Sequence, residues 1–147
     1  MCDEVKRERA EGVSASESLL KVVCAVIECG SKILAARRGP SQSHAGLWEF
    51  PGGKLNGGES ALQALIREIR EELGVEIVPQ TALTPVIYEY PSITIELIPF
   101  ISQIISGEPF PHEHSEIIWI EPRDALNLEW VSADIPVFKE YLQYLPV

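Results

Sequence analysis

The segment GGKLNGGESALQALIREIREELGVEI, residues 52–77, constrains this chain more than any other. A glycine-rich turn leads into a run in which apolar residues recur at three- and four-residue spacing, and this pattern predicts an amphipathic helix. Gly74 provides the kind of C-terminal stop that helices favour. The predicted apolar stripe consists of Leu62, Leu65, Ile66, Ile69 and Leu73.

The opposite side of the predicted helix carries an acidic cluster. Glu68, Glu71 and Glu72 fall within an arc of about 100° around the helix axis. Like charges one turn apart repel by a few tenths of a kcal/mol, so the helix itself gains nothing from the cluster. A hard divalent cation such as Mg²⁺ reverses this effect, because it binds carboxylates and substrate phosphates together. The cluster is therefore compatible with a solvated acidic face or with a metal site.

The spacing of the whole segment distinguishes these two interpretations. Five residues follow Gly53 before Glu59, seven more precede Arg67, and the run REIREELGV then ends at Val75. This segment resembles the Nudix box, G-x5-E-x7-R-E-U-x-E-E-x-G-U, in which U is an aliphatic residue. Every fixed position matches, which makes the signal far more specific than a glycine-rich loop alone. The resemblance favours the metal site.

Composition sets the class of protein. A chain of 147 residues with 46% hydrophobic content is the size of one globular domain. We expect residues 1–18, which are polar and mixed in charge, to form a flexible leader, and residues 19–147 to form the folded domain. Cys2, Cys24 and Cys29 have no metal-ligand spacing, so free thiols in a reducing cytoplasm are expected.

The charge and hydropathy of the chain limit its partners. A net charge of −10, without a long cluster of Lys and Arg, disfavours a nucleic acid polymer as partner. No apolar run approaches the roughly eighteen residues that a membrane-spanning helix needs, so no membrane partner is expected. A small phosphate-bearing molecule is compatible, because bound cations would neutralise its charge locally.

The remaining segments predict strands around the central helix. Residues rich in β-branched side chains over Leu19–Glu28 and Lys32–Arg38, separated by a turn, predict a hairpin. Pro79 and Pro85 predict an irregular connection after the helix. Three later segments are predicted as strands: Val86–Tyr90, Ile93–Ile105 and Glu116–Ile120.

The C-terminal segment predicts a second helix. Apolar residues including Ile135 and Phe138 recur at helical spacing over Ala133–Leu145. Strands before and after a central helix, with another helix at the end, predict an α/β fold in which helices flank a mixed sheet.

The resemblance extends beyond the box, over nearly all of residues 20–145. LWEFPGGK and SADIPVF are similar to segments of the MutT-like branch of Nudix hydrolases and of bacterial CTP pyrophosphohydrolases. The resemblance implies a Nudix-type α/β/α sandwich. It also implies a cytoplasmic enzyme of nucleotide-pool sanitation, acting with Mg²⁺ or Mn²⁺ on a nucleoside triphosphate to release the monophosphate and pyrophosphate.

The resemblance also assigns site residues. Arg67 is expected to pair with Glu59 or Glu71 and to hold the carboxylates in position. Either Glu68 or Glu113 is the expected general base. The resemblance also places one more metal-associated acid in the loop at residues 111–116, for which Glu113 is the first match and Glu116 the second. The implied metal ligands are Gly53, through its carbonyl, with Glu68, Glu71, Glu72 and Glu113.

Three further residues are candidates for substrate binding. Asp134, before the last helix, matches the position that reads the base edge in the MutT-like branch. Phe50 is expected to line the base pocket. Arg38 would contact phosphate or base, although a solvent-facing cation at a strand end is an equal alternative.

The substrate prediction is ordered but open. An oxidised nucleotide, 8-oxo-dGTP, is favoured, and (d)CTP or a 5-substituted dCTP is a close second. A non-catalytic Nudix-fold binding module is disfavoured because all box carboxylates are present. A dinucleoside polyphosphate or ADP-sugar hydrolase would share the box, but its extra specificity segments are not evident. Either a monomer or a homodimer is compatible with the sequence.

Overall fold

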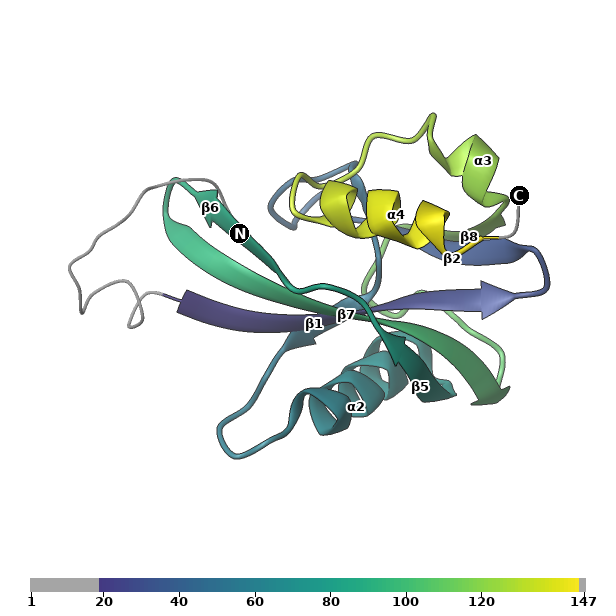
Figure 1. The fold of residues 1–147 in the computed structure, drawn as a ribbon, viewed down its shortest axis with the longest axis horizontal. Helices are drawn as coiled ribbons and strands as arrows, with labels where there is room; N and C mark the ends of the chain where they lie inside the picture. The colour runs from purple at the N-terminus through teal and green to yellow at the C-terminus, as the bar shows by residue number, and fades with distance from the viewer. Residues whose placement is uncertain (1–18, 146–147) are drawn as a thin grey trace.

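A computed structural model describes residues 19–145, so the predicted leader lies outside the described residues. One mixed sheet separates helix α2 from helices α3 and α4, which confirms the predicted α/β sandwich (Figure 1). The strands are β1 (Leu19–Cys29), β2 (Lys32–Arg37), β3 (Trp48–Glu49), β4 (Gly52–Lys54), β5 (Glu76–Ala82), β6 (Val86–Tyr90), β7 (Ile93–Ser106) and β8 (Glu116–Ile120). The helices are α2 (Ala61–Leu73), α3 (Pro122–Ala125) and α4 (Asp134–Gln143).

The sheet is built around the parallel pair of β1 and β7, and its other strand pairs are antiparallel. The strand order is β3-β2-β1-β7-β5, with β4 on β1, β6 on β7 and β8 on β2. The predicted hairpin is confirmed, with Cys29 opposite Lys32. On its other edge, β1 pairs with β2 near its C-terminus and with β4 at residues 22–24. The glycine-rich turn is therefore attached directly to the central strand.

Residues 22–27 of β1 form an unbroken apolar run because both faces of the strand are covered there. Cys24 and Val26 belong to the hydrophobic cluster on the α4 side of the sheet. Val23, Ala25 and Ile27 belong to the cluster on the α2 side, and each is fully buried. The two layers of helices thus share one central strand.

Helix α2 begins and ends with strong local signals. The Ser60 hydroxyl accepts a hydrogen bond from the Gln63 backbone at 3.1 Å, and the Gln63 side chain accepts one from the Ser60 backbone at 2.9 Å. This capping box satisfies two free N–H groups. Gly74 ends the helix with a φ of 73°, as predicted. The apolar stripe is confirmed at Leu65, Ile69 and Leu73, whereas Leu62, in the first turn, is 48% exposed.

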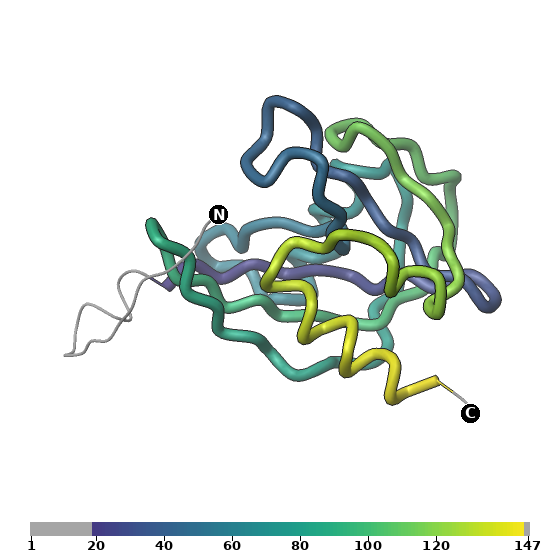
Figure 2. The backbone as a smooth tube through the Cα atoms, turned by 90° about the horizontal axis from the view of Figure 1, so that it is seen from above, coloured from purple at the N-terminus to yellow at the C-terminus, as the bar shows by residue number. Residues whose placement is uncertain are grey.

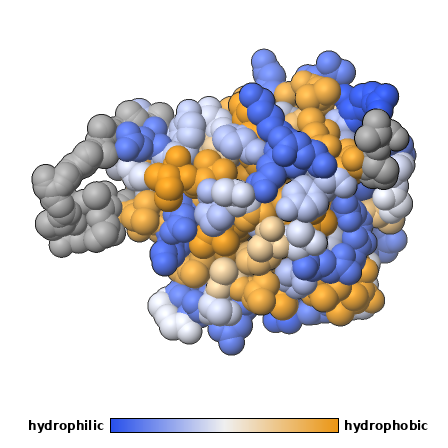
Figure 3. Space-filling view, viewed as in Figure 1, coloured by the Kyte–Doolittle hydropathy of each residue, from blue (hydrophilic) through white to orange (hydrophobic). Residues whose placement is uncertain are grey.

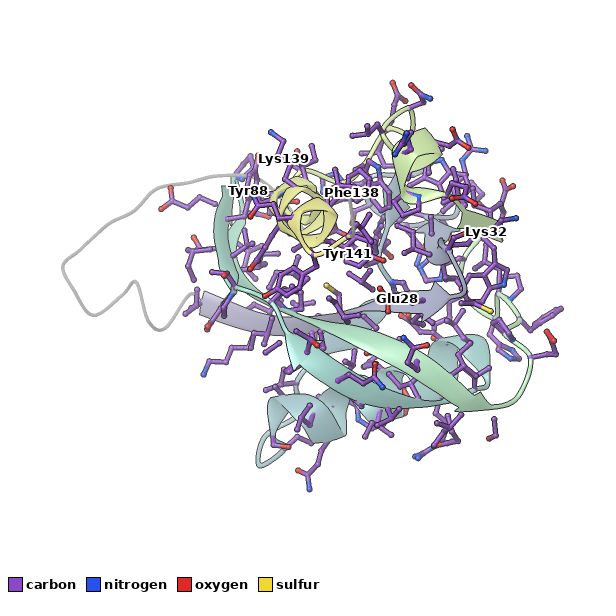
Figure 4. The ribbon with its side chains drawn as sticks, turned by 45° about the vertical axis from the view of Figure 1, so that its right-hand side comes forward. Glu28, Lys32, Tyr88, Phe138, Lys139 and Tyr141 are labelled. Atoms are coloured by element: carbon purple, nitrogen blue, oxygen red, sulfur yellow. The ribbon has the colours of Figure 1, made fainter. Side chains whose placement is uncertain are left out.

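Helix α4 buries the predicted Phe138 but leaves the predicted Ile135 exposed. Its buried residues are Asp134, Val137, Phe138 and Tyr141, which follow the i, i+3, i+4, i+7 pattern. Ile135 is about 100° away from Asp134 around the helix and is exposed. Figure 4 shows Tyr141 pointing to Glu28 of β1, whose carboxylate accepts its hydroxyl at 2.7 Å. This bond fixes α4 to the central strand.

The irregular connection predicted between Pro79 and Pro85 is confirmed only for residues 83–85, because residues 76–82 form strand β5. This strand lies at the end of the sheet and pairs with β7. The register of this pair shifts between Glu76 and Ile77 and again between Pro79 and Thr81. Pro79 is tolerated because it lies in an edge strand beside such a bulge. The side chains of Val78 on β5 and Ile87 on β6 are exposed. Hydrophobic surface is visible on this face of the molecule (Figure 3).

Two loops meet on one side of the sheet. Figure 2 shows the loop after β2 beside the loop between β7 and β8. The backbone N–H of Ser115 donates to the carbonyl of Arg37 at 2.9 Å, which joins their bases. Among the helices of residues 19–145, none is long and apolar enough to cross a membrane.

Candidate active site

The glycines of β4 allow other parts of the chain to pack closely against the turn. A Cβ at residue 52 would overlap the backbone of Val23, and a Cβ at residue 53 would overlap the Glu68 carboxylate. Gly53 therefore lets the side chain of Glu68 lie directly against the turn. This contact brings one acid of the helix to the edge of the sheet.

Arg67 organises the acids on the outer face of α2. Its Nε and Nη2 donate to the two carboxylate oxygens of Glu59 at 2.6 and 2.9 Å. Its Nη1 donates to Glu68 at 2.9 Å and to Glu71 at 3.3 Å. The predicted pairing with Glu59 and with Glu71 is confirmed. The Arg67 hydrogen bonds are the largest cause of a pKa of about 2 at Glu59, so this carboxylate is firmly ionised.

Glu72 has the opposite environment. Its side chain is buried, and its Oε1 accepts the backbone N–H of Gly52 at 3.2 Å. Burial, followed by the charges of Glu49, Glu113 and Glu68, raises its pKa to about 9. Glu113 thus acts electrostatically on the box acids although it belongs to a distant loop, whereas Glu116 pairs with Arg37 at 3.5 Å.

The acids of the described residues are not arranged around one point as the ligands of a metal ion would be. In the described part of the chain, no three His, Cys, Asp or Glu side chains form a group arranged to hold a cation. The carboxylates of Glu68 and Glu71 form ion pairs with Arg67, while that of Glu72 accepts a hydrogen bond from the Gly52 backbone. The donors nevertheless fit Mg²⁺, because they are hard oxygen ligands and the excess negative charge around Glu72 is what a divalent cation compensates. The set Gly53, Glu68, Glu71, Glu72 and Glu113 therefore stays a prediction.

A cavity of about 380 Å³ adjoins these acids. Its size suits a small organic ligand. Its lining includes Gly53 and Glu72 from the box, apolar side chains of β1 and β7, and the three predicted substrate-binding residues, Arg38, Phe50 and Asp134. The structure therefore brings together candidates that are far apart in the sequence.

Asp134 lies at the first position of α4 and is buried. Its Oδ2 accepts the backbone N–H of Phe50 at 2.8 Å. Burial, with a smaller contribution from Glu49, raises its pKa well above the ordinary range. The ring of Phe50 also lines the cavity, but it packs on Trp130 with ring centroids 4.7 Å apart. Phe50 thus serves both the core and the cavity wall.

Arg38 is held within the protein. Its Nη1 donates to Glu49 at 2.9 Å, and its Nε donates to the carbonyl of Ser43 at 2.5 Å. The alternative of a solvent-facing cation at the end of a strand is wrong, because only 15% of the side chain is exposed. Arg38 fixes Glu49 and the loop after β2.

Sequence reasoning missed Glu49 and His114. Glu49 follows the buried Trp48 in the short strand β3, and its carboxylate lines the cavity. His114 Nε2 lies 2.8 Å from Glu49 Oε2, although the two residues are 65 positions apart. The sequence offered only the quoted segment LWEFPGGK and the loop PHEHSE, with no spacing that links them.

The loop that carries Glu113 and His114 is attached to the end of α2 by its backbone. The N–H groups of Phe110 and His112 donate to the carbonyls of Leu73 and Glu72 at 3.0 and 3.1 Å. These helix carbonyls have no partner within the helix, so the loop acts as a cap. The box helix and the cavity wall are joined at this point.

Comparison with known proteins agrees with this geometry. The family model described as the NUDIX domain matches residues 18–141. The chain is 38% identical to the CTP pyrophosphohydrolase of Escherichia coli (strain K12), over 84% of this chain and 92% of that protein. It is 33% identical to the putative 8-oxo-dGTP diphosphatase 2 of Mycobacterium tuberculosis (strain H37Rv), over 77% and 81%. The solution structure of the E. coli ORF135 protein superimposes with a TM-score of 0.78, at 36% identity, over 90% of this chain and 94% of that one.

Proposed function

This chain belongs to the Nudix hydrolase family, and we propose that it hydrolyses a cytosine nucleoside triphosphate, (d)CTP or a 5-substituted dCTP, to the monophosphate and pyrophosphate. The observation that carries the proposal is the cavity that adjoins the box acids and has Glu49 and Asp134 in its wall. This order reverses the preference for 8-oxo-dGTP that the sequence alone suggested.

The acids of the cavity suit a cytosine ring. A carboxylate oxygen accepts a hydrogen bond from the exocyclic amino group of cytosine. Burial raises the pKa of Asp134 and so favours its protonated form, in which the carboxyl group donates to a ring acceptor. Glu49 supplies the acceptor and Asp134 the donor, and the two groups together match an amino group beside a ring nitrogen.

The box supplies the chemistry. Glu68, Glu71 and Glu72, with Glu113 and the Gly53 carbonyl, would hold Mg²⁺ or Mn²⁺. The bound ion lowers the pKa of water and neutralises phosphate charge. Arg67 keeps Glu59, Glu68 and Glu71 in place through its hydrogen bonds. Either Glu68 or Glu113 accepts the proton of the attacking water, and the partly enclosed cavity orients the nucleoside.

The second candidate substrate is 8-oxo-dGTP. It is favoured by the similarity to the putative 8-oxo-dGTP diphosphatase 2. An oxidised guanine also presents an exocyclic amino group, which the Glu49 carboxylate would accept.

A substrate panel tests the proposal. Purified protein would be assayed with Mg²⁺ on CTP, dCTP, 5-methyl-dCTP, dGTP, dTTP and 8-oxo-dGTP, with separate detection of pyrophosphate and phosphate. We expect pyrophosphate release, with kcat/KM for cytosine nucleotides about tenfold or more above that for the others. A preference for 8-oxo-dGTP would restore the second candidate. Failure to hydrolyse any triphosphate would refute both.

A further inference from the structure

His114 is buried at a cost that packing does not explain. Only 1% of its side chain is exposed, and its Nε2 lies 2.8 Å from Glu49 Oε2. Its Nδ1 is also buried, without a hydrogen-bond partner among residues 19–145. A buried, unsatisfied nitrogen destabilises the folded state, so an apolar side chain would serve stability better here.

The bond to His114 completes a two-point hold on Glu49. Arg38 Nη1 donates to Oε1 of the same carboxylate at 2.9 Å. Arg38 follows β2 and His114 precedes β8, so two separate loops fix the plane of one carboxylate. Each carboxylate oxygen keeps another lone pair for a ligand.

The held carboxylate occupies a central place in the site. Glu49 lines the cavity together with Glu72 and Asp134. Its charge contributes to the raised pKa of both of these residues, so it lies near the box acids and near the proposed base reader at once. A small rotation of Glu49 would therefore change the acceptor pattern that a nucleotide meets.

We propose that His114 is a positioning residue for nucleotide selection, whose hydrogen bond fixes the Glu49 carboxylate to receive the exocyclic amino group of a base. This inference rests on the proposed function, because it places the base in the cavity beside Glu49. His114 itself does not touch the nucleotide and acts on it only by positioning Glu49.

Three substitutions test the role of the Nε2 hydrogen bond. The amide nitrogen of His114→Gln can take the place of Nε2, whereas that of His114→Asn is one bond too short and His114→Leu has no donor. We expect the Leu and Asn variants to lose about tenfold in kcat/KM on the best nucleotide, chiefly because KM rises. The ratio of kcat/KM between that nucleotide and the others should also fall. We expect His114→Gln to stay within about threefold of the native protein. The melting temperature of His114→Leu should equal or exceed that of the native protein.

His112 supplies the matched control. It lies in the same loop and is exposed. His112→Gln and His112→Leu should leave KM and base preference unchanged. Equal losses in His114→Gln and His114→Leu, or no loss in His114→Leu, would overturn the proposal.

A double-mutant cycle separates action through Glu49 from a general effect on the loop. In a Glu49→Gln background, His114→Leu should cause little additional loss. A full additional loss would show that His114 does not act through Glu49. The cycle uses whichever nucleotide the panel finds best, so a preference for 8-oxo-dGTP would defeat the proposed substrate and still leave the role of His114 measurable.

Discussion

The outer face of α2 and the wall of the cavity both gather acids, but they stabilise them in different ways. On the helix, Arg67 donates to three carboxylates that lie close in sequence. In the wall, Glu49, Glu72 and Asp134 come from three separate elements, and two of them are buried beside other acids. The first region is held by an internal cation. The second keeps a surplus of negative charge for ligands to compensate.

The contrast is visible in two acidity constants. Hydrogen bonding to Arg67 lowers the pKa of Glu59 to about 2, whereas burial beside like charges raises the pKa of Glu72 to about 9. Glu59, which only organises the site, is thus already paired within the protein. Glu72, in the cavity wall, is left for a cation, and substitutions in the two regions should therefore differ in their effects.

The largest expected effect comes from a box carboxylate. Glu71→Gln keeps the shape of the side chain and removes its charge, and because the side chain is 55% exposed the fold should be unaffected. We expect kcat with Mg²⁺ to fall about a hundredfold or more, since a bound metal contributes several kcal/mol to the transition state. Glu108→Gln, at an exposed position of the loop before β8, is the control. Near-normal turnover of Glu71→Gln would show that Glu71 is no ligand.

Replacing the organising cation should have the next largest effect. Arg67→Lys keeps the positive charge but loses the guanidinium fork that reaches Glu59 and Glu68 together. We expect a loss of about 10- to 100-fold in kcat/KM, the range typical of groups that orient metal ligands. Arg70→Lys, one turn away and paired with Glu76, should be near neutral. Equal losses in Arg67→Lys and Arg70→Lys would show that Arg67 has no particular role in holding the acids.

The glycine turn gives a smaller and more local effect. A Cβ in Gly53→Ala would displace the Glu68 carboxylate, and because that is the end of a flexible side chain, the fold should tolerate the change. We expect about a tenfold loss of kcat, with the free energy of unfolding changed by less than about 0.5 kcal/mol. At Gly57, an added Cβ would meet no described atom within 4 Å, so Gly57→Ala is the matched control. Kinetics and urea unfolding of both variants would check this.

The cavity wall should respond in selectivity rather than in rate. Asp134→Ala removes the carboxyl group that would pair with the base, together with the acceptor of the Phe50 N–H. We expect the ratio of kcat/KM between cytosine and other nucleotides to change by about fivefold or more, because one pair of hydrogen bonds to a base contributes about 1–3 kcal/mol of discrimination. An unchanged ratio with lower rates throughout would assign Asp134 to the fold alone.

The same contrast explains what could be predicted from the sequence. The box acids, Arg67 and Gly74 share one helix and its cap, so their spacing indicates their arrangement. Glu49 and His114 meet only through the packing of β3 against the loop before β8, and no local pattern encodes that meeting. Arg38 was a predicted site residue, but its contacts with Glu49 and Ser43 could not be predicted, since they depend on where the loop after β2 folds.

The secondary structure shows a similar division. Both strands of the first hairpin have apolar patterns strong enough to predict them. Strand β5 was hidden by Pro79, because pairing at the end of the sheet overrides the local preference of a proline. On α4 the apolar spacing placed Phe138 correctly but not Ile135, because the polar Asp134 takes the buried position in the first turn.

The attachment of the loop before β8 to the last carbonyls of α2 is made entirely by main-chain atoms. The side chain at position 114 can therefore be exchanged without breaking the hydrogen bonds that hold the loop over the site. For an engineer, variation at position 114, with Glu113 retained, is a route to new nucleotide preferences that leaves the hydrolytic centre unchanged.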